Sequence, residues 1–219
     1  DKVSHQEGEM SILQMVTAGI ALVGAFIFII GVVAVIVAAQ RRPYQSELAP
    51  VKRSPGLGVV YAFTLGMAPW AKESARRHWI AYIRGIIIHV GIFVAAAFLI
   101  ASPWLAQMVL PLRLSLAALF GVGAVLGVAG FGIRLNDPTM RLLSTPDDYF
   151  SLALVTLFLA SGAVTAIKPD FLPVFWAVSG ITLAYAPFGK IKHFIYFFYE
   201  RVFIGLFFGR RGVLEWTHE

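Results

Sequence analysis

Long apolar runs separated by short polar segments dominate the pattern of the chain. A helix that crosses a bilayer needs about 20 mostly apolar residues, and five runs reach that length. The sequence therefore predicts an all-α integral membrane protein, a bundle of five transmembrane helices in one domain over residues 1–219. The approximate spans are 12–39, 78–101, 112–133, 147–167 and 171–198.

Local signals refine three of these spans. Thr145 is expected to cap the helix of the fourth span, because Pro146 follows at the first helical position and two aspartates occupy the first turn. Pro187 is expected to kink the fifth span. The third span is rich in Gly and Ala, which lets neighbouring helices approach closely.

The longest predicted loop covers residues 41–77. Its segment 54–58, Ser-Pro-Gly-Leu-Gly, predicts irregular structure. The stretch Val59–Met67 is apolar but short, and Pro69 follows it. We therefore expect that stretch to lie at the membrane interface or to re-enter the membrane without spanning it.

Basic residues predict the orientation. With the N-terminus outside, the inner side receives all of the 18 Lys and Arg residues except Lys2, Arg84, Arg113 and Lys168. This bias predicts a multi-pass protein of the cell membrane, N-out and C-in. The aromatic C-terminal segment then lies at the cytoplasmic interface, as an aromatic belt or against a partner.

Composition supports contact with membrane lipid. Of the 219 residues, 58% are hydrophobic and 14% charged, far from the balance of a soluble domain. The net charge of +6 falls in short clusters between apolar runs, so no nucleic-acid partner is expected. With no cysteine, the chain cannot itself hold a disulfide or an iron–sulfur cluster.

Two of the five histidines need an explanation. His5 and His218 lie in polar tails, and His78 lies beside arginines as an interfacial anchor. His89 and His193 lie in apolar segments, where ionisable residues are rare and usually functional. The alternative for His89 is a neutral imidazole bonded to a neighbouring carbonyl or serine.

His89 and His193 fall at matching depth in the inner half of the membrane, if the fifth span continues as helix to Arg201. Two such histidines suit the two axial positions of a haem b, which needs no covalent attachment. Candidates to neutralise the haem propionates are Arg84, Arg141, Lys190 and Lys192. Snorkelling to the membrane surface is the alternative for Arg84, Lys190 and Lys192.

Three stretches carry a resemblance to a known family: Phe-Gly-Lys-Ile-Lys-His-Phe at 188–194, Ile-His-Val-Gly-Ile at 88–92 and the link 141–148. Together they resemble the gamma subunit family of respiratory nitrate reductase, which includes the cytochrome b subunits of heterodisulfide-reductase-like and sulfite-reductase-linked complexes. The resemblance implies a haem b subunit of a respiratory complex. Such a subunit passes electrons between menaquinone or ubiquinone and an iron–sulfur or flavin subunit on the cytoplasmic face.

Carried over by position, the resemblance makes His89 and His193 the axial ligands of the haem nearer that partner. The family's second haem would need histidines at about Leu99 and Phe175, which cannot ligate iron. One haem is therefore expected, and the quinone site stays unassigned.

No catalytic motif occurs: the sequence has no G-x-x-x-x-G-K, H-E-x-x-H or G-x-S-x-G and no cysteine nucleophile. We therefore expect an electron-transfer subunit and not a complete enzyme. A haem-free membrane anchor that only docks a partner complex is the main alternative. A small transporter is disfavoured, because buried acids are scarce and no internal repeat is visible.

Overall fold

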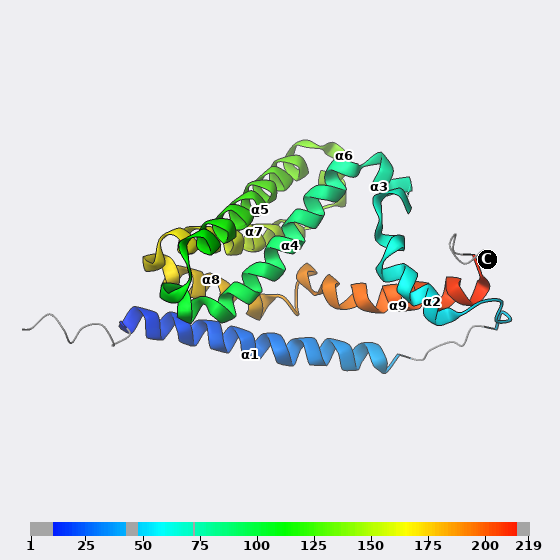
Figure 1. The fold of residues 1–219 in the computed structure, drawn as a ribbon, viewed down its shortest axis with the longest axis horizontal. Helices are drawn as coiled ribbons and strands as arrows, with labels where there is room; N and C mark the ends of the chain where they lie inside the picture. Colours follow the sequence, from blue (N-terminus) through cyan, green and yellow to red (C-terminus); the bar gives the residue numbers. More distant parts are fainter. Residues whose placement is uncertain (1–10, 43–47, 72, 214–219) are drawn as a thin grey trace, which may run out of the picture. The chain divides into compact units, whose positions relative to one another are not determined.

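The structure, a computed structural model, describes residues 11–42, 48–71 and 73–213. It is 87% helical, and the described residues form no strand (Figure 1). The α-helices are α1 (Ile12–Gln40), α2 (Pro55–Phe63), α3 (Glu73–Arg77), α4 (Trp79–Ala101), α5 (Leu110–Asn136), α6 (Pro138–Leu143), α7 (Pro146–Ile167), α8 (Leu172–Tyr185) and α9 (His193–Arg211). Short 3-10 turns are η1 (Leu65–Met67), η2 (Pro69–Ala71), η3 (Ser102–Gln107), η4 (Pro169–Phe171) and η5 (Lys190–Lys192).

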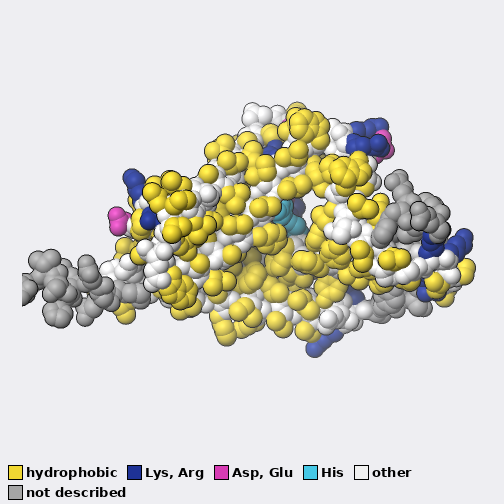
Figure 2. Space-filling model, in the orientation of Figure 1, with side chains coloured by type: hydrophobic (Ala, Val, Ile, Leu, Met, Phe, Trp, Pro, Cys, Tyr) yellow, Lys and Arg dark blue, Asp and Glu magenta, His cyan; other side chains and the backbone are white. Residues whose placement is uncertain are grey.

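Four of the described helical segments are long and apolar enough to cross a membrane: α1, α4 continued through η3, α5 and α7. A fifth span exists if Pro169–Tyr185 and Lys190–Arg211 act together. Hydrophobic side chains cover most of the face in Figure 2, as lipid contact requires. The predicted all-α, multi-pass membrane class is confirmed.

The start of α7 follows its sequence signals. Thr145 is the N-cap, Pro146 takes the first helical position, and Asp148 completes a capping box. The Asp148 carboxylate accepts hydrogen bonds from the backbone N–H and the hydroxyl of Thr145, both at 2.8 Å. This predicted cap is confirmed, and its aspartates lie where the helix dipole favours negative charge.

The fifth predicted span is interrupted, so the prediction of one helix over 171–198 is wrong. The helix α8 ends at Tyr185, a turn follows, and α9 begins at His193. Pro187 lacks a backbone N–H and Gly189 favours non-helical backbone, so together they end a helix where one proline was expected only to kink it.

The prediction of irregular structure at 54–58 is also wrong, because α2 begins there. Pro55 takes the first helical position, and the Ser54 hydroxyl accepts a hydrogen bond from the Leu57 N–H at 3.4 Å. The same Ser-Pro pair that breaks a strand is a start signal for a helix. With nine residues, α2 is too short to span a bilayer, as predicted for this part of the loop.

The chain forms two compact units. Of the described residues, the first comprises 11–31 and 85–191, and the second comprises 32–42, 48–71, 73–84 and 192–213.

The core of the first unit is a cluster of aromatic rings. The Phe98 ring lies 5.6 Å from that of Phe120 and 5.3 Å from that of Phe175, which stacks on Phe158 at 5.6 Å. Beside this cluster the buried Trp176 indole donates a hydrogen bond to the Ser102 hydroxyl at 2.8 Å. The rings thus join α4, α5, α7 and α8 into one core.

Glycines let α5 lie against α7 over much of its length (Figure 1). A Cβ on Gly127 would lie 2.3 Å from the Thr156 hydroxyl oxygen, and one on Gly123 would lie 2.9 Å from a Leu159 methyl carbon. The close approach expected from this Gly-rich span is confirmed.

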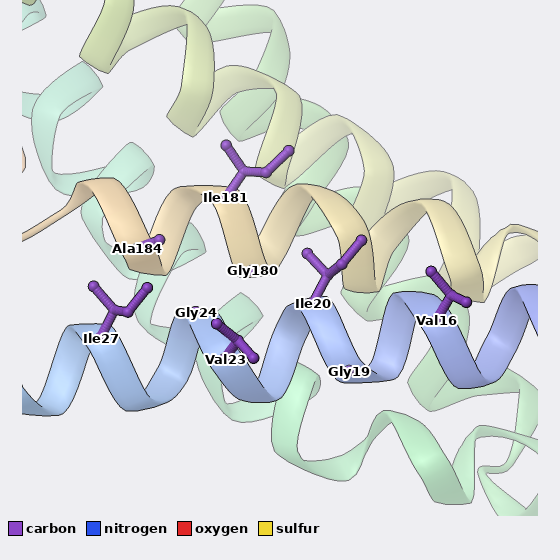
Figure 3. A pocket seen from close by; sticks show the side chains of 9 residues that line it. All are labelled: Val16, Gly19, Ile20, Val23, Gly24, Ile27, Gly180, Ile181 and Ala184. Atoms are coloured by element: carbon purple, nitrogen blue, oxygen red, sulfur yellow. The ribbon is translucent and has the colours of Figure 1, made fainter.

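A glycine crossing also joins α1 to α8. A Cβ on Gly24 would lie 2.1 Å from the Gly180 carbonyl oxygen, so the two backbones touch there. Beside the crossing runs a groove of about 400 Å³, lined by α1 and α8 (Figure 3). Its lining is Val16, Gly19, Ile20, Val23, Gly24, Ile27, Gly180, Ile181 and Ala184. Its lining has no polar side chain. The groove can therefore pack against hydrocarbon, but it has no side chain that would orient a polar ligand.

In the second unit, α2 and α9 lie side by side although far apart in sequence (Figure 1). A Cβ on Gly205 would lie 2.4 Å from the Val59 Cα, and one on Gly58 would lie 2.1 Å from the Gly205 carbonyl oxygen. At the other end of the contact, the Phe63 ring lies 6.3 Å from that of Phe197. Backbone contact over this length makes α2 and α9 an antiparallel pair.

Candidate functional site

His89 lies on α4 in the first unit, and its ring is exposed on the helix surface. Its Nδ1 lies 2.7 Å from the carbonyl oxygen of Gly85, one helical turn earlier. A carbonyl oxygen only accepts hydrogen bonds, so Nδ1 carries the proton and donates. The lone pair of the neutral ring is then on Nε2.

This arrangement has the chemistry of a metal-ligating histidine. Such a residue usually donates its other ring N–H to a backbone carbonyl or carboxylate, which fixes the tautomer and the ring orientation. This tautomer is the one that can offer Nε2 to a haem iron. It equally matches the alternative of an imidazole satisfied by a neighbouring carbonyl.

His193 is the first residue of α9 and belongs to the second unit. It is exposed and follows the turn η5 directly. The helical path to Arg201 assumed from the sequence exists, because α9 runs unbroken from His193 through Arg201.

Of the four cations expected near propionates, Lys190 has an acidic partner in the first unit. Its ammonium lies 2.8 Å from the Asp148 carboxylate, whose side chain is only 12% exposed. Asp148 already compensates the charge of Lys190. Lys192 is half-buried at the end of η5, Arg141 is exposed in the last turn of α6, and Arg84 is half-buried on α4.

A second polar cluster links α7 to the end of α8. The Tyr185 hydroxyl donates a short hydrogen bond to the Asp147 carboxylate, and Ser151 donates to the same oxygen at 3.2 Å. The Tyr185 ring also packs edge-on against Phe150, with the centroids 4.7 Å apart. These contacts fix the last turn of α8 just before the chain turns toward His193. Their role is to hold the two helices together.

Arg201 on α9 is the residue that sequence reasoning missed. It is only 9% exposed, and its wholly buried Nε has no hydrogen-bond partner in the described part of the chain. Its guanidinium carbon lies 5.3 Å from the centroid of the Phe197 ring. From the sequence it counted only as one more inner-side positive charge. Its neighbours on α9, Phe197 and Gly205, pack against α2, a helix that the sequence did not predict.

Within residues 11–42, 48–71 and 73–213, no three His, Cys, Asp or Glu side chains gather to hold a metal ion. His78, expected as an interfacial anchor, is exposed between α3 and α4. The tail histidines His5 and His218, and the basic residues Lys2 and Lys72, lie outside the described residues.

Comparison with protein-family models finds no match to the chain, and searches of curated proteins and of solved structures find none either.

Proposed function

We propose that the chain is the haem b membrane subunit of a respiratory oxidoreductase complex. It relays electrons between a quinone pool and an iron–sulfur or flavin subunit on the inner face of the cell membrane. Its resemblance to nitrate reductase gamma subunits in the three stretches given above supports this role. The chemistry of the complex's other substrate is proposed to belong to a partner chain, in keeping with a sequence that has no catalytic motif.

The observation that supports the proposal most is the hydrogen bond from Nδ1 of His89 to the Gly85 carbonyl oxygen. It holds the ring in the tautomer whose Nε2 can ligate iron. His89 and His193 are the proposed axial ligands of a single haem, which when bound supplies one-electron transfer. With haem bound, the two imidazoles would hold its iron and basic side chains would neutralise its propionates.

The proposed topology is five spans, N-out and C-in. The bias of Lys and Arg toward one side supports the orientation. The fifth span is then the broken pair Pro169–Tyr185 and Lys190–Arg211, which passes as a span only when taken together. Non-helical backbone at membrane depth is tolerated where it is buried in protein or lines a water-filled cavity.

A haem-free anchor that docks a partner complex is the second candidate. The observation that favours it is the same His89 hydrogen bond, because a purely structural imidazole would be satisfied by it too.

An optical difference spectrum of the purified protein separates the two functions. Reduced-minus-oxidised bands of a low-spin bis-histidine haem b are expected for the wild type. His89→Ala and His193→Ala should each lose these bands or convert them to a five-coordinate spectrum. His78→Ala is the matched control, an exposed histidine outside the proposed site, and should keep the wild-type spectrum.

A wild-type protein without haem bands would establish the anchor and refute the relay. Unchanged spectra in both ligand variants would refute the ligand assignment even with haem present.

A further inference from the structure

A row of residues on α9 connects the proposed iron ligand to the buried arginine. His193, Phe197, Arg201, Gly205 and Gly209 recur at every fourth position, so they form one ridge along the helix. All five lie in the second unit, where α9 is a single helix. His193 occupies one end of this ridge, and Arg201 lies two steps along it.

The far part of the ridge packs on α2. Gly205 and Gly209 meet the backbone of Gly58, and Phe197 meets the ring of Phe63. Arg201 lies between these two contacts, which explains why the side chain is buried to 9% exposure. The contact with α2 thus encloses a cation.

Nothing in the described part of the chain compensates this charge. The two ion pairs found there join Arg77 to Glu73 and Lys190 to Asp148, and neither involves Arg201. The Nε of Arg201 is buried without an acceptor, and the Phe197 ring offers only its π face. A guanidinium is too basic to shed its proton, so its burial calls for an anion with hydrogen-bond acceptors.

We infer that Arg201 binds a propionate of the haem whose iron His193 ligates. This inference rests on the proposed function. A propionate is a carboxylate on a flexible arm, and a guanidinium fork recognises a carboxylate through paired hydrogen bonds. The ridge rises about 12 Å from His193 to Arg201, a distance that a propionate arm and an extended arginine side chain would bridge together.

Arg201 is a better partner than Lys190, because Asp148 already compensates Lys190. A lipid phosphate is less suited, because Arg201 is only 9% exposed and a headgroup outside the protein has little access to its guanidinium.

The first test is the midpoint potential of the haem in the purified protein. Arg201→Met removes a positive charge beside the propionate, which favours the oxidised haem, so the potential should fall. Arg201→Lys keeps the positive charge, so its midpoint potential should lie much closer to the wild-type value than that of Arg201→Met. Arg77→Met is the control: it removes the same charge from an exposed ion pair in the same unit and should leave the potential unchanged.

The second test uses thermal unfolding with and without haem. In the wild-type background, Arg201→Met should weaken haem retention and lower the melting temperature. In the haem-free double variant His89→Ala/His193→Ala, the same change removes an uncompensated buried charge and should raise the melting temperature. This reversal of sign is expected only if the haem supplies the counter-charge.

The outcomes separate the inference from the proposed function. A wild-type haem with both histidine ligands, together with an unchanged potential in Arg201→Met, would overturn the propionate assignment alone. A lower melting temperature in both backgrounds would also overturn it, since Arg201 would then have a structural role. A wild-type protein without haem would overturn both.

Discussion

The contact between α2 and α9 should not tolerate a methyl group at Gly58. A Cβ there would lie 2.1 Å from the Gly205 carbonyl oxygen and 2.6 Å from the Gly209 Cα. Both neighbours are backbone and cannot rotate away, so the helices must separate by about 1 Å to restore normal contact. Overpacking of this kind lowers the free energy of unfolding by up to about 3 kcal/mol. Alanine has a higher helix propensity than glycine, which offsets about 1 kcal/mol of that loss. Gly58→Ala should therefore lose about 2 kcal/mol of stability.

Thermal unfolding in detergent, followed by helical circular dichroism, measures this loss. For a chain of this size 2 kcal/mol corresponds to a melting temperature lower by about 4–8 °C. Gly56→Ala is the control in the same helix, because the nearest atom to its Cβ is the Ser54 hydroxyl oxygen at 3.9 Å. That variant should be neutral or slightly more stable. Equal melting temperatures for the two variants would refute the backbone contact between α2 and α9.

Two further substitutions test how the first unit is held together. Arg113→Gln removes guanidinium hydrogen bonds to the carbonyl oxygens of Ala166 (2.9 Å) and Ile167 (3.0 Å) at the end of α7. It should cost about 1–3 kcal/mol in thermal unfolding, and wild-type stability would contradict this cap. Tyr185→Phe removes one donor to Asp147 and should cost about 1 kcal/mol while leaving any haem spectrum unchanged. A lost spectrum would mean that this tyrosine acts at the cofactor.

The membrane class and four spans could be predicted because each depends on one local property. An apolar run as long as Ile12–Gln40 is most stable as a helix that crosses the bilayer, because the helix satisfies all of its backbone hydrogen bonds internally. The cap at Thr145 was equally local. The end of α8 at Tyr185 was not predicted. Apolar residues continue on both sides of Pro187, so the hydropathy pattern contains no signal for the turn.

The residues of the candidate site divide in the same way. His89 could be predicted as a site residue from the sequence, because an imidazole in an apolar helix is unusual. Its hydrogen bond to Gly85 is seen only in the three-dimensional structure. The burial of Arg201 could not be predicted from the sequence. The residues beside this arginine on α9 pack against α2, a helix distant in sequence whose Ser-Pro-Gly start resembles a loop.

The ratio of haem to polypeptide in the purified protein tests the central claim most directly. Haem measured as its pyridine complex, divided by chain concentration from amino-acid analysis, should give one haem b per chain, held by His89 and His193. A ratio of two would contradict the single-haem assignment, and a ratio of zero would contradict electron relay by this chain altogether.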